Sequence, residues 1–111
     1  MNKFDELRNK INTEYRAVTN SIKIGNSEYA FAWAVLDALN NYVEELIVRI
    51  YVGHMSQETA FSRLCVRVNT QYDYCVDAAY KFDNDVHELN IAKGIFFSMM
   101  NAMNEIIERN N

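Results

Sequence analysis

Four potential metal ligands fall close together late in the chain: Asp83, Asp85, His87 and Glu88. Carboxylate and imidazole groups bind hard and borderline cations, so this group is the first candidate for chemistry. A calcium loop needs a mid-loop glycine and a closing glutamate at greater spacing, and this segment has no glycine. A transition-metal site would need another ligand, and His54 would lie roughly 40 Å away along the intervening helix. We therefore expect no metal and no other cofactor, and we interpret the acids as helix-capping residues.

Arg49 and His54 form an Arg-x4-His pair near the middle of the chain. This spacing resembles the motif of HEPN ribonucleases, helical bundles in which the two residues meet across a dimer cleft and act on RNA. The resemblance implies a ribonuclease that uses Arg49 and His54. It covers these two residues alone: Ile50 replaces the polar residue that usually follows the arginine, and the family tends to carry the motif late in the chain. The alternative interpretation is that both residues complement the C-terminal dipole of a helix.

No nucleophile motif and no glycine-rich phosphate loop is present, so we predict that the protein is not an enzyme. The net charge is −4 with dispersed basic residues, which makes nucleic acid an improbable partner. The segment Met1–Glu6 carries acids where a signal peptide needs an apolar run, and no uninterrupted apolar stretch reaches the roughly 20 residues of a membrane span. Cys65 and Cys75 are expected as reduced thiols. These features predict a soluble cytoplasmic protein.

Half of the 111 residues are hydrophobic, there is no proline, and the only glycines are Gly25, Gly53 and Gly94. Sheet proteins of this length need many tight turns, which recruit glycine and proline. We therefore expect few, long helices in a single domain over residues 1–111.

Apolar residues recur at steps of three and four in four segments, which predicts helices over about 3–24, 28–52, 57–82 and 86–108. Short connections make neighbouring helices antiparallel, so the expected fold is an all-α, antiparallel four-helix bundle. Ser27 and Ser56 are expected to cap the second and third helices. Residues 83–85 are assigned to the start of the fourth helix, because acids are favourable there.

Several further expectations concern packing. The second helix is apolar over most of its girth, which indicates a central position or an oligomer interface. Arg63 and Arg67 are expected to pair with Glu44 and Glu45. Phe82 and the methionines of the fourth helix are expected in the core, and Phe97 falls outside the core stripe. Asn90 or Gly94 could divide the fourth helix, with Gly94 allowing a close helix contact.

The strongest candidate binding surface lies where tyrosines alternate with acids toward the end of the third helix. Tyrosine is enriched among the residues that dominate protein interfaces. The predicted partner-binding residues are Asp73, Tyr74, Asp77, Tyr80, Asp83 and Asp85.

The sequence therefore predicts a protein-binding module whose partner has a basic surface. Bacterial immunity proteins and phage anti-defence proteins have this general character, and charge complementarity speeds such encounters. The predicted role is an inhibitor that covers a basic surface of an effector such as a nuclease. The alternatives are a structural or regulatory homo-oligomer, such as a homodimer, and the HEPN-like ribonuclease.

Overall fold

The computed structural model describes residues 2–110, and these form an antiparallel bundle of four long helices. The elements are α1 (Lys3–Lys23), a single 3-10 turn η1 (Ser27–Tyr29), α2 (Ala30–Tyr51), α3 (Gln57–Lys81) and α4 (His87–Arg109). The predicted all-α fold and the number of helices are confirmed. Between residues 2 and 110, none of the helices combines the length and hydropathy that a membrane span needs.

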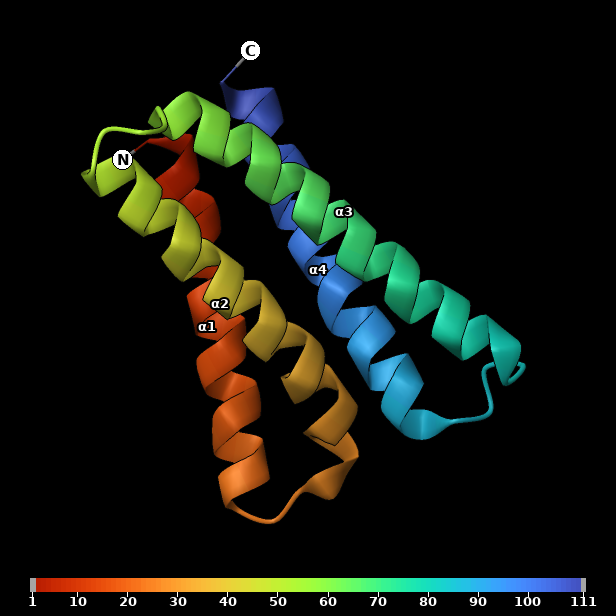
Figure 1. Ribbon diagram of the computed structural model, residues 1–111. Helices are drawn as coiled ribbons and strands as arrows, with labels where there is room; N and C mark the ends of the chain where they lie inside the picture. Colours follow the sequence, from red (N-terminus) through yellow and green to blue (C-terminus); the bar gives the residue numbers. More distant parts are fainter. Residues whose placement is uncertain (1, 111) are drawn as a thin grey trace.

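The helices are arranged as two hairpins, α1–α2 and α3–α4. Figure 1 shows the hairpins close together at the end where the chain begins and ends, and spreading apart toward their other ends. The α3 helix lies at the front in this view, with α4 behind it and packed against it. One long side of α3 is therefore left without a neighbouring helix over much of its length.

The core is built from one apolar stripe on each helix. The spacing of three and four residues keeps these side chains on one face of each helix. Phe96 and Met99 of α4 are fully buried at the centre, so the predicted core role of the methionine stripe holds for Met99 and Met103. In the described part of the chain, no polar or charged residue is fully buried. Core residues from the other helices include Leu7, Ile11, Leu36, Leu39, Leu46, Leu64 and Val68.

The first three helices end in the same way. After each last turn, one residue takes a positive φ: Gly25 at 92°, Gly53 at 80° and Asp83 at 52°. The next backbone N–H then donates to a carbonyl five residues earlier, over 2.9 Å in all three cases. These are Schellman closures, which satisfy carbonyls that the helix itself leaves free.

This geometry corrects the assignment of residues 83–85. Asp83 and Asn84 both have positive φ and close the end of α3, so they do not start α4. The fourth helix begins at His87, after Val86, which caps it without a side-chain hydrogen bond. The expectation failed because the requirement for a left-handed residue at the end of α3 outweighs the preference of acids for N-termini.

Two other local expectations are also corrected. Ser27 begins η1 and makes no capping hydrogen bond to α2, which starts three residues later. Gly94 makes no close helix contact, because a Cβ added there would meet nothing within 4 Å, and α4 is continuous. The cap at Ser56 is confirmed: its Oγ accepts a hydrogen bond from the N–H of Thr59 over 3.1 Å.

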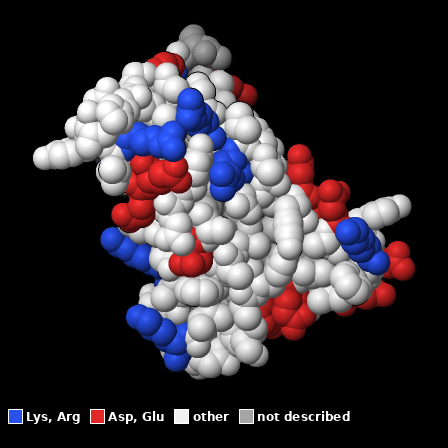
Figure 2. Space-filling model, viewed as in Figure 1, with Lys and Arg blue, Asp and Glu red and all other residues white. Residues whose placement is uncertain are grey.

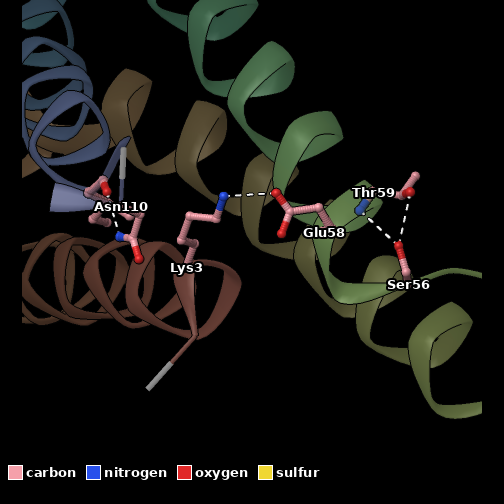
Figure 3. A network of polar contacts seen from close by, with 6 residues as sticks. Lys3, Ser56, Glu58, Thr59 and Asn110 are labelled. Carbon is pink, nitrogen blue, oxygen red and sulfur yellow. Dashed lines mark hydrogen bonds and ion pairs between the residues drawn. The ribbon is translucent and has the colours of Figure 1, made fainter. Parts of the chain in front are cut away.

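Polar contacts hold the helices together where the two hairpins meet. Lys3 of α1 pairs with Glu58 of α3 over 2.8 Å, close to the Ser56 cap (Figure 3). Arg109 of α4 pairs with Glu6 of α1 over 2.7 Å. Both pairs lie at the surface, so they fix register more than they add stability.

Candidate functional site

The six predicted binding residues lie at the end of α3 and in the connection to α4, and all six are exposed. Asp73, Tyr74, Asp77 and Tyr80 share one side of the last turns of α3 because they are spaced by three or four residues. Asp83 and Asp85 follow in the connection. We call these six residues the acidic tyrosine face.

A shallow hollow of about 540 Å³ lies at this end of α3. Tyr74, Asp77, Ala78, Lys81 and Phe82 line it, and all five come from α3 or the residue directly after it. The small side chain of Ala78 leaves room between the two aromatic rings. Phe82 was expected in the core, but 56% of it is exposed because α3 ends one residue earlier and the chain turns away. The hollow therefore adds Lys81 and Phe82, which the sequence did not indicate as site residues.

The tyrosines of α3 differ in how firmly they are held. The ring of Tyr74 packs against Phe31 of α2, with 5.9 Å between ring centroids, and half of the residue stays exposed. Tyr72 is half-buried against Phe97 of α4, at 6.2 Å. Tyr80 is 75% exposed. Tyr74 is thus a positioned aromatic side chain with an open edge, and Tyr80 projects into solvent.

The connection after α3 is held in place by α4. The side-chain amide of Asn90 donates to the carbonyl of Asn84 over 2.6 Å, and Lys93 donates to its Oδ1 over 3.2 Å. These contacts fix the left-handed turn and with it the position of Asp83. Asn90 therefore anchors the connection and does not divide α4.

The carboxylates of the acidic tyrosine face are not neutralised within the protein. Among residues 2–110, none of Asp73, Asp77, Asp83 and Asp85 forms an ion pair or a side-chain hydrogen bond. Figure 2 shows red atoms along the edge of the second half of α3 and blue atoms over its first half. Between Arg63 and Asp77 the charge on this helix is therefore basic first and acidic second, with Lys81 at its end.

Arg63 and Arg67 lie on the first half of α3. Neither forms the expected ion pair with Glu44 or Glu45. Glu45 pairs instead with Arg49, 2.8 Å away on the same helix. Arg67 lies over the ring of Tyr42, 4.0 Å from its centroid, and Arg63 has no ion pair among the described residues. Glu45 therefore has its partner on its own helix, and Glu44 forms no ion pair among residues 2–110.

A groove of about 410 Å³ runs beside these two arginines, between α2 and α3. It is also lined by Tyr42, Val66 and the hydroxyl-bearing Thr59, Ser62 and Thr70. The pair Arg63–Arg67 at helical spacing was the only signal in the sequence for this basic region.

Arg49 and His54 lie at the end of α2, and both are exposed. The guanidinium of Arg49 forms an ion pair with Glu45. The backbone N–H of His54 donates a hydrogen bond to the carbonyl of Arg49 at the end of the helix. Because Gly53 turns the chain, His54 lies beyond the helix. The two residues therefore share a helix end as the sequence suggests.

The group of ligands around His87 does not gather into a cluster. Within residues 2–110, no three His, Cys, Asp or Glu side chains are placed to hold a metal ion together. His87 instead lies 3.1 Å from a carboxylate oxygen of Glu28 in η1 and so links the two hairpins.

The fold and site together define an all-α bundle with an acidic, aromatic end on one helix. Comparison of the chain with known protein families, with curated proteins and with solved structures found no match.

Proposed function

We propose that the protein is a non-enzymatic binding module that recognises a basic surface on another protein through the acidic tyrosine face. One observation carries this proposal: four carboxylates without an ion pair surround exposed tyrosines at one end of α3. Unpaired surface carboxylates attract a cationic partner over about a Debye length, and aromatic side chains supply contact area.

The conformation of the connection also supports this proposal. Asp83 occupies a left-handed position that glycine fills at the ends of α1 and α2. A non-glycine residue there costs about 1 kcal/mol, so Asp83 makes the protein less stable than glycine at this position would. Strained residues are common where a protein binds a ligand or partner. In the proposed complex, the carboxylate of Asp83 would contact a basic group of the partner.

The proposed role is that of an inhibitor. By covering a basic substrate-binding surface of an effector such as a nuclease, the protein would block that effector without chemistry of its own. Charge complementarity would then make association fast and sensitive to salt.

The proposal is tested by capturing the partner with three forms of the protein. The face variant is Tyr80→Ala/Asp83→Asn/Asp85→Asn, which removes one ring and two charges, and asparagine tolerates the left-handed position. The control variant, Tyr51→Ala/Glu105→Gln/Glu108→Gln, makes the same changes at exposed positions elsewhere. Proteins captured from the cells that make this chain are identified by mass spectrometry, and their affinities are then measured.

We expect a partner with a basic surface that binds the wild type and the control variant alike. The face variant should raise its Kd at least about tenfold, and added salt should weaken binding of the wild type. A partner that binds the face variant as tightly as the wild type would overturn the proposal.

A further inference from the structure

The exposed side of α3 has a pattern that is symmetric about its middle. Arg63, Val66, Thr70, Tyr74 and Asp77 form one exposed stripe with steps of three and four residues. Thr70 is the centre: Val66 and Tyr74 lie four residues from it on either side, and Arg63 and Asp77 lie seven. Thr59 and Lys81 extend the stripe by a further four residues in each direction, and both are also exposed.

The charges are opposite at the two ends of the central part of this stripe, residues 63–77, and Lys81 lies beyond its acidic half. Arg63 and Arg67 make the first half basic, and Asp73 and Asp77 make the second half acidic (Figure 2). None of these four residues has an ion-pair partner within residues 2–110. Arg63 and Asp77 are about 21 Å apart along the helix axis, too far to pair within one molecule.

We propose that this stripe binds a second copy of the same chain, with the two α3 helices antiparallel and a two-fold axis at Thr70. A symmetric dimer of this kind uses the same patch on both subunits. In this arrangement Arg63 lies opposite Asp77 of the second copy, and Val66 lies opposite its Tyr74. The spacing of three and four residues is that of helices that pack along their length.

Charge also determines the direction of the pairing. A parallel arrangement would place arginines against arginines and aspartates against aspartates, and like charges in contact oppose association. The antiparallel arrangement places each basic half against an acidic half. The position of Arg67 over Tyr42 holds its guanidinium beside the stripe, where it adds to the positive charge of the basic half.

The shape of the molecule allows this approach. The α3 helix is at the front in Figure 1, and α4 lies behind it. Val66 is 65% exposed and Tyr74 is 50% exposed. On each side of the two-fold axis, the dimer would therefore bring Val66 of one copy against Tyr74 of the other. Exposed charge pairs are screened by salt, so we expect a weak dimer that dissociates as the salt concentration rises.

The proposed dimer does not depend on the proposed function, because it requires no other protein. Asp73 and Asp77 belong both to the dimer stripe and to the acidic tyrosine face. A basic target and a second copy would therefore compete for α3, and this competition, unlike the dimer, rests on the proposed function.

The test is a charge swap measured by sedimentation equilibrium. One variant, Arg63→Asp/Arg67→Asp, makes residues 63–77 of the stripe acidic, and a second, Asp73→Arg/Asp77→Arg, makes them basic. We expect the wild type to dimerise at low salt, and each variant alone to have a dimer Kd at least about tenfold higher. An equimolar mixture of the two variants should dimerise again, because every pair is then complementary. Arg16→Asp/Lys23→Asp, which makes the same charge change on α1, should leave the dimer intact.

A wild type that stays monomeric at low salt, or a mixture that fails to dimerise, would overturn the proposal. Circular dichroism shows whether each variant is folded. If a charge variant does not fold, Thr70→Cys tests the axis directly, because two cysteines on it fall within the roughly 7 Å between Cα atoms that a disulfide spans. Rapid oxidation to a linked dimer is expected for Thr70→Cys. Oxidation no faster than that of Thr13→Cys on α1 would also overturn the proposal.

Discussion

The hydroxyl of Tyr15 on α1 donates a hydrogen bond to Oδ1 of Asp37 on α2 over 2.8 Å. The ring of Tyr15 stacks on Trp33, with 6.4 Å between centroids, and the indole N–H of Trp33 donates to Thr19 over 3.1 Å. These contacts join the two helices of the first hairpin at a partly buried position. The hydrogen bond to Asp37 also raises the pKa of Tyr15 above its usual 10.0, and burial adds to the effect.

We predict that Tyr15→Phe lowers the free energy of unfolding by about 1 to 2 kcal/mol near neutral pH, because it removes one hydrogen bond to a charged acceptor. The folded protein holds the tyrosine proton more tightly than the unfolded chain does. Its contribution is therefore complete below pH 10 and is lost as the pH rises through the higher pKa of the folded state. Urea unfolding followed by circular dichroism should show the difference between wild type and Tyr15→Phe shrinking above pH 10. A difference that does not change with pH would contradict this assignment.

Two glycines should respond to alanine in opposite directions. Gly94 lies within α4, and a Cβ added there meets nothing within 4 Å, so Gly94→Ala should stabilise the protein by about 1 kcal/mol. Gly53 also has open space, but its φ is 80°, so Gly53→Ala should destabilise by about 1 kcal/mol. Thermal unfolding of both variants measures the two effects. Destabilisation by Gly94→Ala would indicate a contact at that position.

How much of this could be read from the sequence depended on the kind of interaction. Apolar spacing predicted all four helices, and Gly25 and Gly53 marked the ends of two of them. Residues 83–85 were assigned to the start of α4 because Asp83 fills the left-handed position that glycine normally marks. Helical spacing was enough to predict that Asp73, Tyr74, Asp77 and Tyr80 share one side of α3, and Asp83 and Asp85 lie near them because they follow directly in the chain.

Features that depend on how helices sit relative to one another were not predictable. The register between α2 and α3 places Arg67 beside α2 as expected, but over Tyr42 and not on a carboxylate. The hollow beside Tyr74 exists because α3 stops at Lys81 and leaves Phe82 outside the core. Both features follow from the angle between the hairpins and from one helix end, and neither has a sequence pattern of its own.

The two cysteines should be slow to react in the folded protein. Both lie on α3 as free thiols, and burial raises the pKa of each to about 11. At pH 8 the reactive thiolate would then be roughly a thousandth of each thiol, against about a tenth at the ordinary value of 9.0. We predict alkylation at least about tenfold slower than in urea, with Cys65 modified before the fully buried Cys75. Mass spectrometry of the labelled peptides measures both, and modification of Cys75 first would contradict the packing of α3.

Stability and binding should separate at Asp83. Glycine at this left-handed position removes the strain that a side chain carries there, so Asp83→Gly should stabilise the protein by about 1 kcal/mol. The same change removes a carboxylate from the acidic tyrosine face, so under the proposed function it should weaken binding to a basic partner. Asp83→Asn, which also tolerates positive φ, serves as the matched control because it removes the charge while keeping a side chain. We expect both variants to bind the partner more weakly. Only Asp83→Gly should raise the free energy of unfolding by the full amount of about 1 kcal/mol. If Asp83→Gly were stabilised and bound the partner as well as the wild type does, the carboxylate would have no part in binding.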